Sequence, residues 1–407
     1  MNALALFRYY SFLSLQLFMG LAGAILSSTV NAIETSGYVG AELRLFPEPA
    51  LYTGQSDNSM SLSGYLETYQ DFDDGDQRIA FTGFVRLDSE DDERSHVDVR
   101  ELYWWKGFDS IELYAGVRKI FWGVTESVHL VDIINQNDAI EGIDGEDKLG
   151  QAMLQFVKPS DYGTFEAFVL PMFRERKFSG EAGRLRPSLP VLEAQYQDEN
   201  EEQHIDFALR WSHYLGVWDI GLSHFSGTNR NPIFMVEADQ AGAPLGLRPH
   251  YQQIEQSGVD VQATVGAWLF KGEAISIDEK DYARNTAAAV GLEYTFFTVA
   301  KTNADLGIVF EYQYDDRIGA RQSQQQNDIA LGARWAFNDI DGSEFLAIVS
   351  QDLDYRNRFV SVEMSRRLTD NWKIEAELGY FLAAESNTVA YELRDDDYFQ
   401  FELRRYF

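Results

Sequence analysis

Charged side chains recur at alternate positions within apolar stretches of this chain, and this spacing has the clearest chemical meaning. Alternate residues of a β-strand share one face, so such charges line one surface of a sheet. Charges of both signs around a narrow aqueous passage orient polar solutes and filter ions. The candidate pore-lining residues in strands are Arg44, Arg78, Arg86, Arg100, Arg118, Arg210, Arg334, Glu42, Glu67 and Glu112.

These charges also fit a structural explanation. Opposite charges on neighbouring strands form cross-strand ion pairs, which satisfy an inward polar face without any transport role. For a single residue the ion pair is the simpler explanation, whereas the set as a whole is more typical of a pore lining.

A second group of polar residues follows Trp122-Gly123. Nearly thirty residues separate two expected strands here, over 121–149, which is long enough for the connection to fold inward. We expect this segment to narrow the lumen of a barrel. Its candidate constriction residues are Glu126, Asp132, Asn135 and Asp138, with His129 beside them.

Enzymatic chemistry is the competing class of function. His224 and Ser226 lie close together in the sequence, which superficially suggests a hydrolase, but the chain has no Gly-x-Ser-x-Gly elbow. It also has no metal-ligand spacing, phosphate-binding loop or dinucleotide fingerprint. The sequence therefore predicts a protein that is not an enzyme and binds no metal and no cofactor.

Charged runs lie between the expected strands. The acidic runs at 71–76, 89–93, 197–202 and 394–397 are interpreted as solvated turns, with divalent-cation binding next to lipopolysaccharide phosphates as the alternative. One basic cluster lies in a long expected loop, and it allows a solvated loop, a lipopolysaccharide contact or an anion-attracting vestibule. Its members are Arg174, Arg176, Lys177, Arg184 and Arg186.

The elements that must position these residues are strands. Period-two alternation recurs from Gly37 to the end, as in Ile329, Leu331, Ala333 and Trp335. It predicts about eighteen strands, with sixteen as the alternative, in an all-β transmembrane antiparallel outer-membrane β-barrel. Short connections alternate with long ones, notably 121–149, 174–203 and 228–249. Such barrels have short periplasmic turns and long external loops.

Tryptophan supports the same architecture. Seven of the eight Trp residues lie near an expected short turn, and only Trp122 lies elsewhere. Because indole prefers the headgroup layer, this clustering predicts one aromatic girdle at the periplasmic interface. The seven are Trp104, Trp105, Trp211, Trp218, Trp268, Trp335 and Trp372.

Both ends of the chain fit a secreted barrel. Residues 1–32 have a basic residue, an apolar stretch and a small-residue cleavage site at Ala32, which is typical of a signal peptide; an uncleaved anchor is the alternative. We expect residues 33–407 to form the barrel. The closing strand alternates apolar and polar residues and ends at Phe407. It resembles the C-terminal signal by which the barrel-assembly machinery recognises outer-membrane proteins, although Arg405 stands where that pattern prefers an apolar residue.

The composition restricts the classes of partner that the chain can bind. The chain has 407 residues, a formal net charge of -31 and no cysteine. Such an excess of acid argues against nucleic acid as a partner, because phosphate binding needs clustered Lys and Arg. The absence of cysteine excludes a disulfide framework.

Four short motifs resemble an uncharacterised family of porin-like outer-membrane β-barrels of Gram-negative bacteria, similar in appearance to alginate-export-type barrels. They are the Asp98-Val-Arg100-Glu101-Leu-Tyr103 strand, Gly116-x-Arg118, Trp122-Gly123 and Asp132-x-x-Asn135-x-x-Asp138; Gln136 stands where related chains often have Pro.

The resemblance implies a porin-like channel in the cell outer membrane. Together with the charge pattern it predicts diffusion or export of small polar or charged solutes, with outer-membrane lipid and lipopolysaccharide as surroundings. A plugged structural or partner-binding barrel is the alternative, and a barrel-embedded hydrolase is the less favoured one.

Overall fold

The computed structural model describes residues 33–280, 282–383, 385–386 and 388–407. The expected signal peptide, residues 1–32, lies outside the described residues. No described helix has the length and apolar character to cross a membrane.

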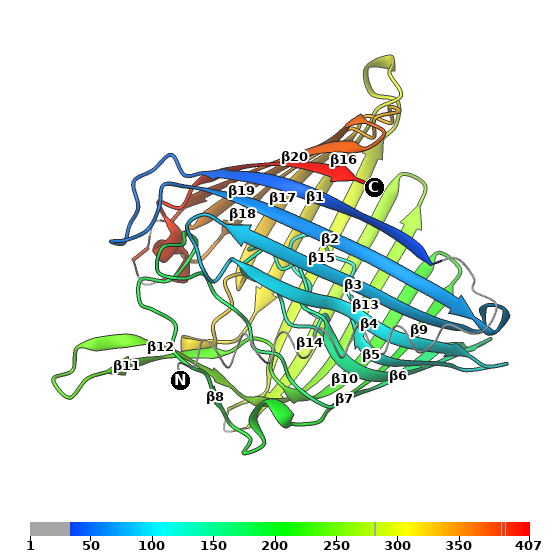
Figure 1. Cartoon of the computed structure of the whole chain (residues 1–407), viewed down its shortest axis with the longest axis horizontal. Coiled ribbons are helices and arrows are strands. Elements are labelled where there is room, and N and C mark those ends of the chain that lie inside the picture. The colour runs from blue at the N-terminus through cyan, green and yellow to red at the C-terminus, as the bar shows by residue number, and fades with distance from the viewer. Residues whose placement is uncertain (1–32, 281, 384, 387) are drawn as a thin grey trace.

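Eighteen antiparallel strands form one closed sheet (Figure 1). The first eight are β1 (Glu34–Leu45), β2 (Asn58–Phe72), β3 (Gln77–Asp88), β4 (His96–Gly107), β5 (Glu112–Arg118), β6 (Gln151–Ser160), β7 (Gly163–Leu170) and β9 (Asp206–Leu215). The next ten are β10 (Trp218–Thr228), β13 (Gln253–Val265), β14 (Trp268–Glu279), β15 (Asn285–Phe296), β16 (Asp305–Asp315), β17 (Asn327–Ala336), β18 (Glu344–Asp352), β19 (Arg358–Thr369), β20 (Trp372–Leu382) and β21 (Tyr398–Tyr406). The prediction of an all-β antiparallel barrel of about eighteen strands is confirmed, and the alternative of sixteen is not.

Closure of the barrel comes from pairing between its first and last strands. β1 runs antiparallel to β21, from Tyr38 opposite Tyr406 to Leu45 opposite Phe399. Each strand therefore has a neighbour on both sides, which removes the unpaired edges that make open sheets prone to association. The last residues of the sequence are needed to complete this ring.

Alternation along the strands separates two surfaces. In β1, Val39 and Leu45 are exposed on the outer face, whereas Glu42 and Arg44 are buried on the inner face. Met60 and Leu62 of β2, and Phe399 and Phe401 of β21, continue the exposed apolar surface. A sheet that places apolar side chains outside and charged ones inside is the architecture of an outer-membrane β-barrel.

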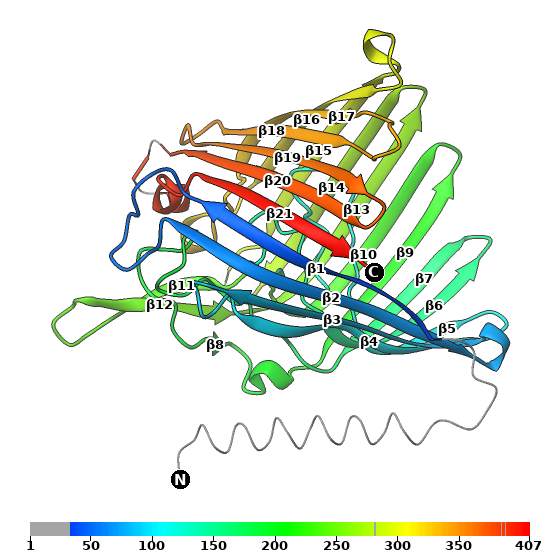
Figure 2. The same ribbon diagram turned by 45° about the horizontal axis from the view of Figure 1, so that its top comes forward.

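Short turns join the strands at one end of the barrel, and longer loops join them at the other (Figure 2). The two-residue turn at 216–217 and the turn at 266–267 place Gly216 and Gly266 at positive φ, where a Cβ would be strained. The long-loop end also has a small sheet of β8 (Gln195–Tyr196), β11 (Ile233–Ala238) and β12 (Pro244–Tyr251). The predicted alternation of short and long connections is confirmed. Five short 3₁₀ turns complete the structure: η1 (Asp73–Gly75), η2 (Glu201–Gln203), η3 (Val299–Lys301), η4 (Gly319–Arg321) and η5 (Val389–Leu393).

The tryptophans near the short turns do not all share one face. Trp218, Trp268 and Trp372 are exposed on the outer face. Trp105 instead pairs with Tyr114 and donates from Nε1 to Glu112 on the inner face. A bulge in β4, where the register shifts opposite Thr82 and Gly83, changes which of its residues point inward. Six of the seven thus fit the expected girdle, and Trp105 does not.

Candidate functional site

The connection between β5 and β6, residues 119–150, folds into the barrel, where Figure 1 shows it inside the ring of strands. We call it the lumen loop. Its residues Trp122, Val131, Ile133 and Ile134 are buried in an apolar cluster with inward-facing side chains of the wall. The wall residues of this cluster are Met153, Phe168, Leu170, Ala208, Phe225, Ile254, Ile275, Ile277 and Ala287.

These wall residues show why the loop packs here. Strands β6, β7, β10 and β14 have apolar side chains on the inner face as well as the outer one, so part of the lumen is not polar. Burying an aliphatic or aromatic side chain stabilises the folded state by about 1.5–3 kcal/mol. This apolar inner surface was not predicted from the sequence, although the apolar residues at alternate inward positions were a visible signal.

Two buried glutamates fix the first half of the loop. Glu273 on β14 is 2% exposed, and its Oε1 accepts hydrogen bonds from the backbone N–H groups of Val124 at 2.7 Å and Thr125 at 3.0 Å. Its Oε2 accepts a third from the N–H of Val131 at 3.2 Å. One carboxylate thereby satisfies three backbone donors that the irregular loop leaves without partners.

Glu311 on β16 likewise accepts hydrogen bonds from backbone N–H groups of the loop, at the two residues that follow Thr125. It is fully buried and accepts from the backbone N–H groups of Glu126 at 2.7 Å and Ser127 at 2.8 Å. The Glu126 side chain then forms ion pairs with Arg334 of β17 at 2.5 Å and Lys271 of β14 at 3.3 Å. The predicted residues Glu126 and Arg334 therefore meet, and they join the loop to the wall.

The second half of the loop is held by the opposite wall. Asp138 accepts from Arg100 of β4 at 2.6 Å, and Glu141 pairs with Arg86 of β3 at 2.7 Å. Arg44 of β1 donates to the backbone carbonyl of Glu141 at 2.6 Å. The lumen loop is thus attached to β14, β16 and β17 on one side and to β1, β3 and β4 on the other, so it crosses the barrel.

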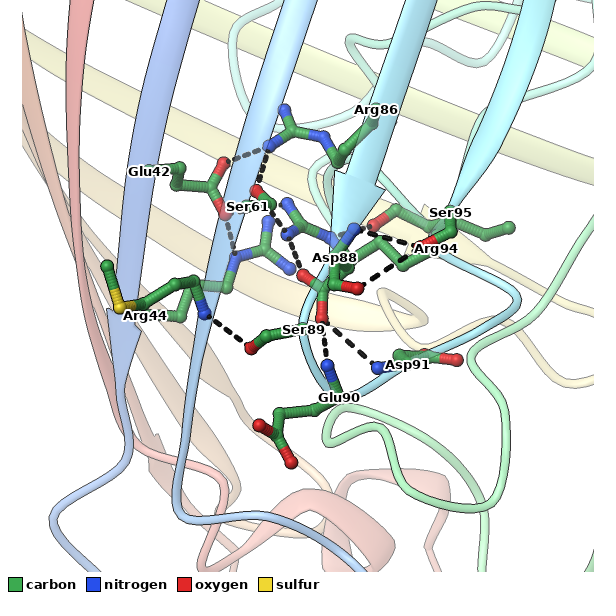
Figure 3. A network of polar contacts seen from close by, with 12 residues as sticks. Glu42, Arg44, Ser61, Arg86, Asp88, Ser89, Glu90, Asp91, Arg94 and Ser95 are labelled. Atoms are coloured by element: carbon green, nitrogen blue, oxygen red, sulfur yellow. Dashed lines mark hydrogen bonds and ion pairs between the residues drawn. The ribbon is translucent and has the colours of Figure 1, made fainter.

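A buried network of charges supports this second attachment (Figure 3). Glu42 pairs with Arg86 at 2.9 Å, with Arg94 at 2.8 Å and with Arg44 at 3.3 Å. Arg94 also pairs with Asp88 at 2.9 Å. Three guanidinium groups around one glutamate leave a positive excess here, and Glu141 of the loop balances part of it. Arg94 was not among the residues predicted from the sequence, because it lies in a loop rather than a strand.

Asn135 joins the two ends of the lumen loop. Its Oδ1 accepts from the N–H of Ile120 at 2.8 Å, and its Nδ2 donates to the carbonyls of Arg118 and Leu149, both at 2.8 Å. Asn135 is 1% exposed, and the Asp132 side chain is buried beside Lys148 at 2.9 Å. Asp132, Asn135 and Asp138 were predicted to constrict the lumen, and that role stays a prediction. They are buried and hold the loop in its conformation.

The remaining predicted strand residues lie on the inner face. Arg78 pairs with Asp71 at 2.6 Å, and Arg210 pairs with Asp260 at 2.8 Å. Arg118 stacks over the ring of Tyr114, with its Cζ 3.8 Å from the ring centroid. Glu112 accepts from Trp105 at 3.1 Å and from Tyr114 at 2.8 Å. Glu67 is exposed to the lumen. Many of these charges are therefore cross-strand ion pairs, as the structural explanation expected for single residues.

The charged runs in the long loops are not all solvated. Arg184 of the basic cluster is 5% exposed and pairs at 2.6 Å with Asp396, which is fully buried. Asp91 is also buried and accepts from the N–H of Gly180 at 3.1 Å. The interpretation of these runs as solvated turns was wrong at these positions. Residues of opposite charge from loops distant in the sequence pair with each other and join the loops.

The other basic residues of the cluster are engaged too. Arg174 pairs with Asp98 at 2.6 Å, and Arg176 donates to Asn231 at 2.7 Å. Arg186 is buried and donates to two backbone carbonyls. These contacts leave the vestibule hypothesis without most of the free cations that it needs.

Titratable groups of the lumen loop have shifted pKa values. Burial lowers the pKa of His129, but the hydrogen bond to Glu146 at 2.6 Å and the negative charges of Glu146, Glu273 and Asp132 together raise it overall. Asp147 still has contact with solvent, but its enclosure by the surrounding protein, together with Asp144 and Glu141, raises its pKa to about 6. The pKa of Asp144 is raised as well, mainly by burial. The surroundings of Asp144 and Asp147 on this face of the loop therefore destabilise the ionised form of both carboxyl groups.

Two candidate chemistries find no support in the geometry. His224 lies on the outer face, with Nε2 3.0 Å from Glu255 and Nδ1 3.0 Å from Ser257, away from the lumen. Within the described residues, no group of three or more His, Asp or Glu side chains is placed to hold a metal ion.

No protein-family model matches the chain. No curated protein matches it either. Solved structures similar to it include OmpT, an outer membrane protein of Vibrio cholerae in its trimer form, with 12% identity and a TM-score of 0.45 over 93% of this chain and 100% of that one. A mutant of Rh. blastica porin is similar with 11% identity and a TM-score of 0.45, covering 92% and 100% of the two chains. At these values the likenesses carry no weight beside the geometry of the barrel itself.

Proposed function

We propose that the chain is a porin-like channel of the outer membrane through which small polar or charged solutes diffuse or are exported. The observation that carries the proposal is the lumen loop, which crosses the barrel while inward-facing charges beside it stay in contact with solvent. Glu363 of β19 and Glu344 of β18 face the lumen and are exposed, whereas Ala287, Ala289 and Ala330 under the loop are buried. The loop therefore covers one side of the inner wall and leaves the other side wetted.

Selection would depend on the radius of this passage and on the charges that face it, without covalent chemistry. The apolar outer face supports residence in lipid, with lipopolysaccharide at the long-loop end. β21 supports recognition by the barrel-assembly machinery, because it is the strand that closes the ring against β1 and it ends next to Phe407.

Planar-bilayer conductance tests the proposal. We expect purified, refolded protein to give discrete single-channel steps, and liposomes containing it to swell in small neutral sugars. Boiled protein of the same preparation is the control. Absence of both signals, from protein whose β-sheet spectrum and heat-dependent gel mobility show a folded barrel, would contradict the channel.

A plugged structural barrel is the second candidate, and one observation favours it. The ion pair of Arg184 with Asp396 joins two long loops across the mouth, and the pair of Arg174 with Asp98 joins a long loop to β4 of the wall. The lumen loop contacts the same long loop where Arg176 donates to Gln136. If folded protein neither conducts nor permits swelling, this second function replaces the first. Hydrolysis of phospholipid or peptide substrates by the purified protein is not expected.

A further inference from the structure

The wetted side of the lumen has an excess of negative charge. Glu363 of β19 and Glu377 of β20 are direct partners on neighbouring strands of this wall, and Asp144 of the lumen loop lies within electrostatic range of both. The loop lies close to this wall, because residues 139–143 line a small cavity together with Glu377 and Tyr398. We call Asp144, Glu363 and Glu377 the acidic trio.

The cations nearest to the acidic trio are already engaged. Arg334 and Lys271 both pair with Glu126. Lys373 pairs with Glu375 at 2.7 Å, and Arg404 pairs with Glu375 at 2.8 Å and Glu402 at 2.6 Å. Arg367 is the inward cation of β19 and forms no ion pair with a described residue, and it lies four residues from Glu363 along the strand, about 13 Å away. Lys373 and Arg404 are therefore neutralised by Glu375 and Glu402, whereas Arg367 keeps its positive charge.

Arg44 is a further cation on this side. It is held by Glu42 at 3.3 Å and by the carbonyl of Glu141 at 2.6 Å. Glu377 itself accepts a hydrogen bond from the Tyr398 hydroxyl, and Glu363 accepts from Ser361 at 3.4 Å, so their partners are neutral. No Lys or Arg among the described residues forms an ion pair with a member of the acidic trio.

The strand register makes this excess costly. Glu363 and Glu377 are direct partners across β19 and β20. Like charges directly opposite each other destabilise a sheet. Mobile cations in the lumen would screen this repulsion. Since no described group of acids is arranged to hold a fixed metal ion, the charge acts as a diffuse field on whatever passes.

We propose that the passage between the lumen loop and β19–β20 prefers cations, so that its solutes are small and positively charged. This inference rests on the proposed channel function. A negative field beside the conducting path raises the local concentration of cations and lowers that of anions, as rings of acidic side chains do in cation channels.

Reversal potentials across bilayers in a KCl gradient at about pH 9, where even closely spaced carboxylates are ionised, measure this preference. We expect the wild-type protein to be more permeable to K⁺ than to Cl⁻. The triple variant Asp144→Asn, Glu363→Gln, Glu377→Gln should lower the permeability ratio by about threefold or more. The single variant Asp144→Asn, which alters only the loop, should give a smaller change in the same direction.

The matched control removes three acids outside the lumen: Asp278→Asn and Glu255→Gln on the outer face, and Glu237→Gln on the β11–β12 hairpin. Its selectivity should equal that of the wild type. A wild-type preference for Cl⁻, or a triple variant with unchanged selectivity, would overturn the inference while leaving the channel intact. Absence of conductance would instead overturn the channel function itself.

Discussion

Glu273 and Glu311 show how single carboxylates can fix a long irregular segment inside a barrel. A loop without secondary structure has backbone N–H groups that need acceptors when they are buried. A carboxylate has two oxygens and can accept several such bonds, and bonds to a charged acceptor are stronger than neutral ones. Five backbone donors of the lumen loop end on these two residues. The conformation of the loop therefore depends on residues of the wall that are distant in the sequence.

Glu273→Ala should release the first half of the loop. The change leaves three buried N–H groups without an acceptor, which should lower the free energy of unfolding by on the order of 3 kcal/mol. Urea titration of the protein in lipid vesicles measures the loss. We also expect larger and noisier single-channel steps. Asp278→Asn on the outer face of the same strand is the control, and equal effects of the two changes would show that Glu273 has no special role.

The acidic face of the lumen loop predicts a dependence of stability on pH. The pKa of Asp147 rises from its ordinary 3.8 to about 6 in the folded protein, chiefly through burial and then through Asp144 and Glu141. The folded state thus binds this proton more tightly than the unfolded state does. Ionised Asp147 destabilises the fold, and this cost is absent below pH 3.8, grows as the pH rises and is complete above about pH 6.

Asp147→Asn should therefore raise the thermal unfolding midpoint at about pH 7.5 and leave it unchanged at about pH 3.5. Differential scanning calorimetry of the detergent-solubilised protein at the two pH values tests this. Glu237→Gln on the exposed hairpin should change neither midpoint. A gain in the midpoint of Asp147→Asn that is equal at both values would show that charge is not its cause.

At the scale of elements, the sequence predicts the strands far better than the loops. The strand prediction succeeds because alternation of Val39, Ala41, Leu43 and Leu45 with polar residues is a local property, repeated around the barrel. The inward fold of 121–149 was also predictable from its length. The attachments of that loop were not, because the pairs of Asp138 with Arg100 and of Glu126 with Arg334 depend on strand register and closure.

The wrong predictions at single positions have a similar cause, because contacts between distant residues and shifts of strand register are not local properties of the sequence. Asp396 and Arg184 are far apart in the sequence, and each alone is typical of a solvated turn. Trp105 turns inward because of a bulge in β4, which shifts the alternation by one residue without a change in composition.

A designed crosslink tests the position of the lumen loop. Ser127 of the loop contacts Gln313 of β16, and the chain contains no cysteine that could compete. The double variant Ser127→Cys, Gln313→Cys should form a disulfide on mild oxidation, detected by mass spectrometry of the linked peptides. Ser127→Cys with Thr82→Cys, an inward residue of β3 on the opposite wall, should not. Equal yields for both pairs would show that the loop moves freely through the lumen.

At the scale of the whole molecule, tryptophans on the outer and inner faces of the barrel should differ in their quenching by lipid. Trp372, Trp268 and Trp218 are exposed on the outer face at the short-turn end, whereas Trp122 is 3% exposed among Phe168 and its neighbours in the lumen. If the barrel spans a bilayer, lipids brominated on their acyl chains should reach the first group and not the second. Single-tryptophan variants, with the other seven replaced by Phe, separate the two populations.

We expect the fluorescence of the variant that keeps Trp372 to be quenched most by bromine close to the headgroups, because indole prefers the interface. The variant that keeps Trp122 should be unaffected by bromine at any depth, yet it should respond to a small aqueous quencher if Glu273→Ala opens the loop. Quenching of Trp122 by lipid would mean that the inner and outer faces are exchanged. The barrel would then not separate lipid from a charged lumen, and neither the channel nor its preference for cations could follow from this architecture.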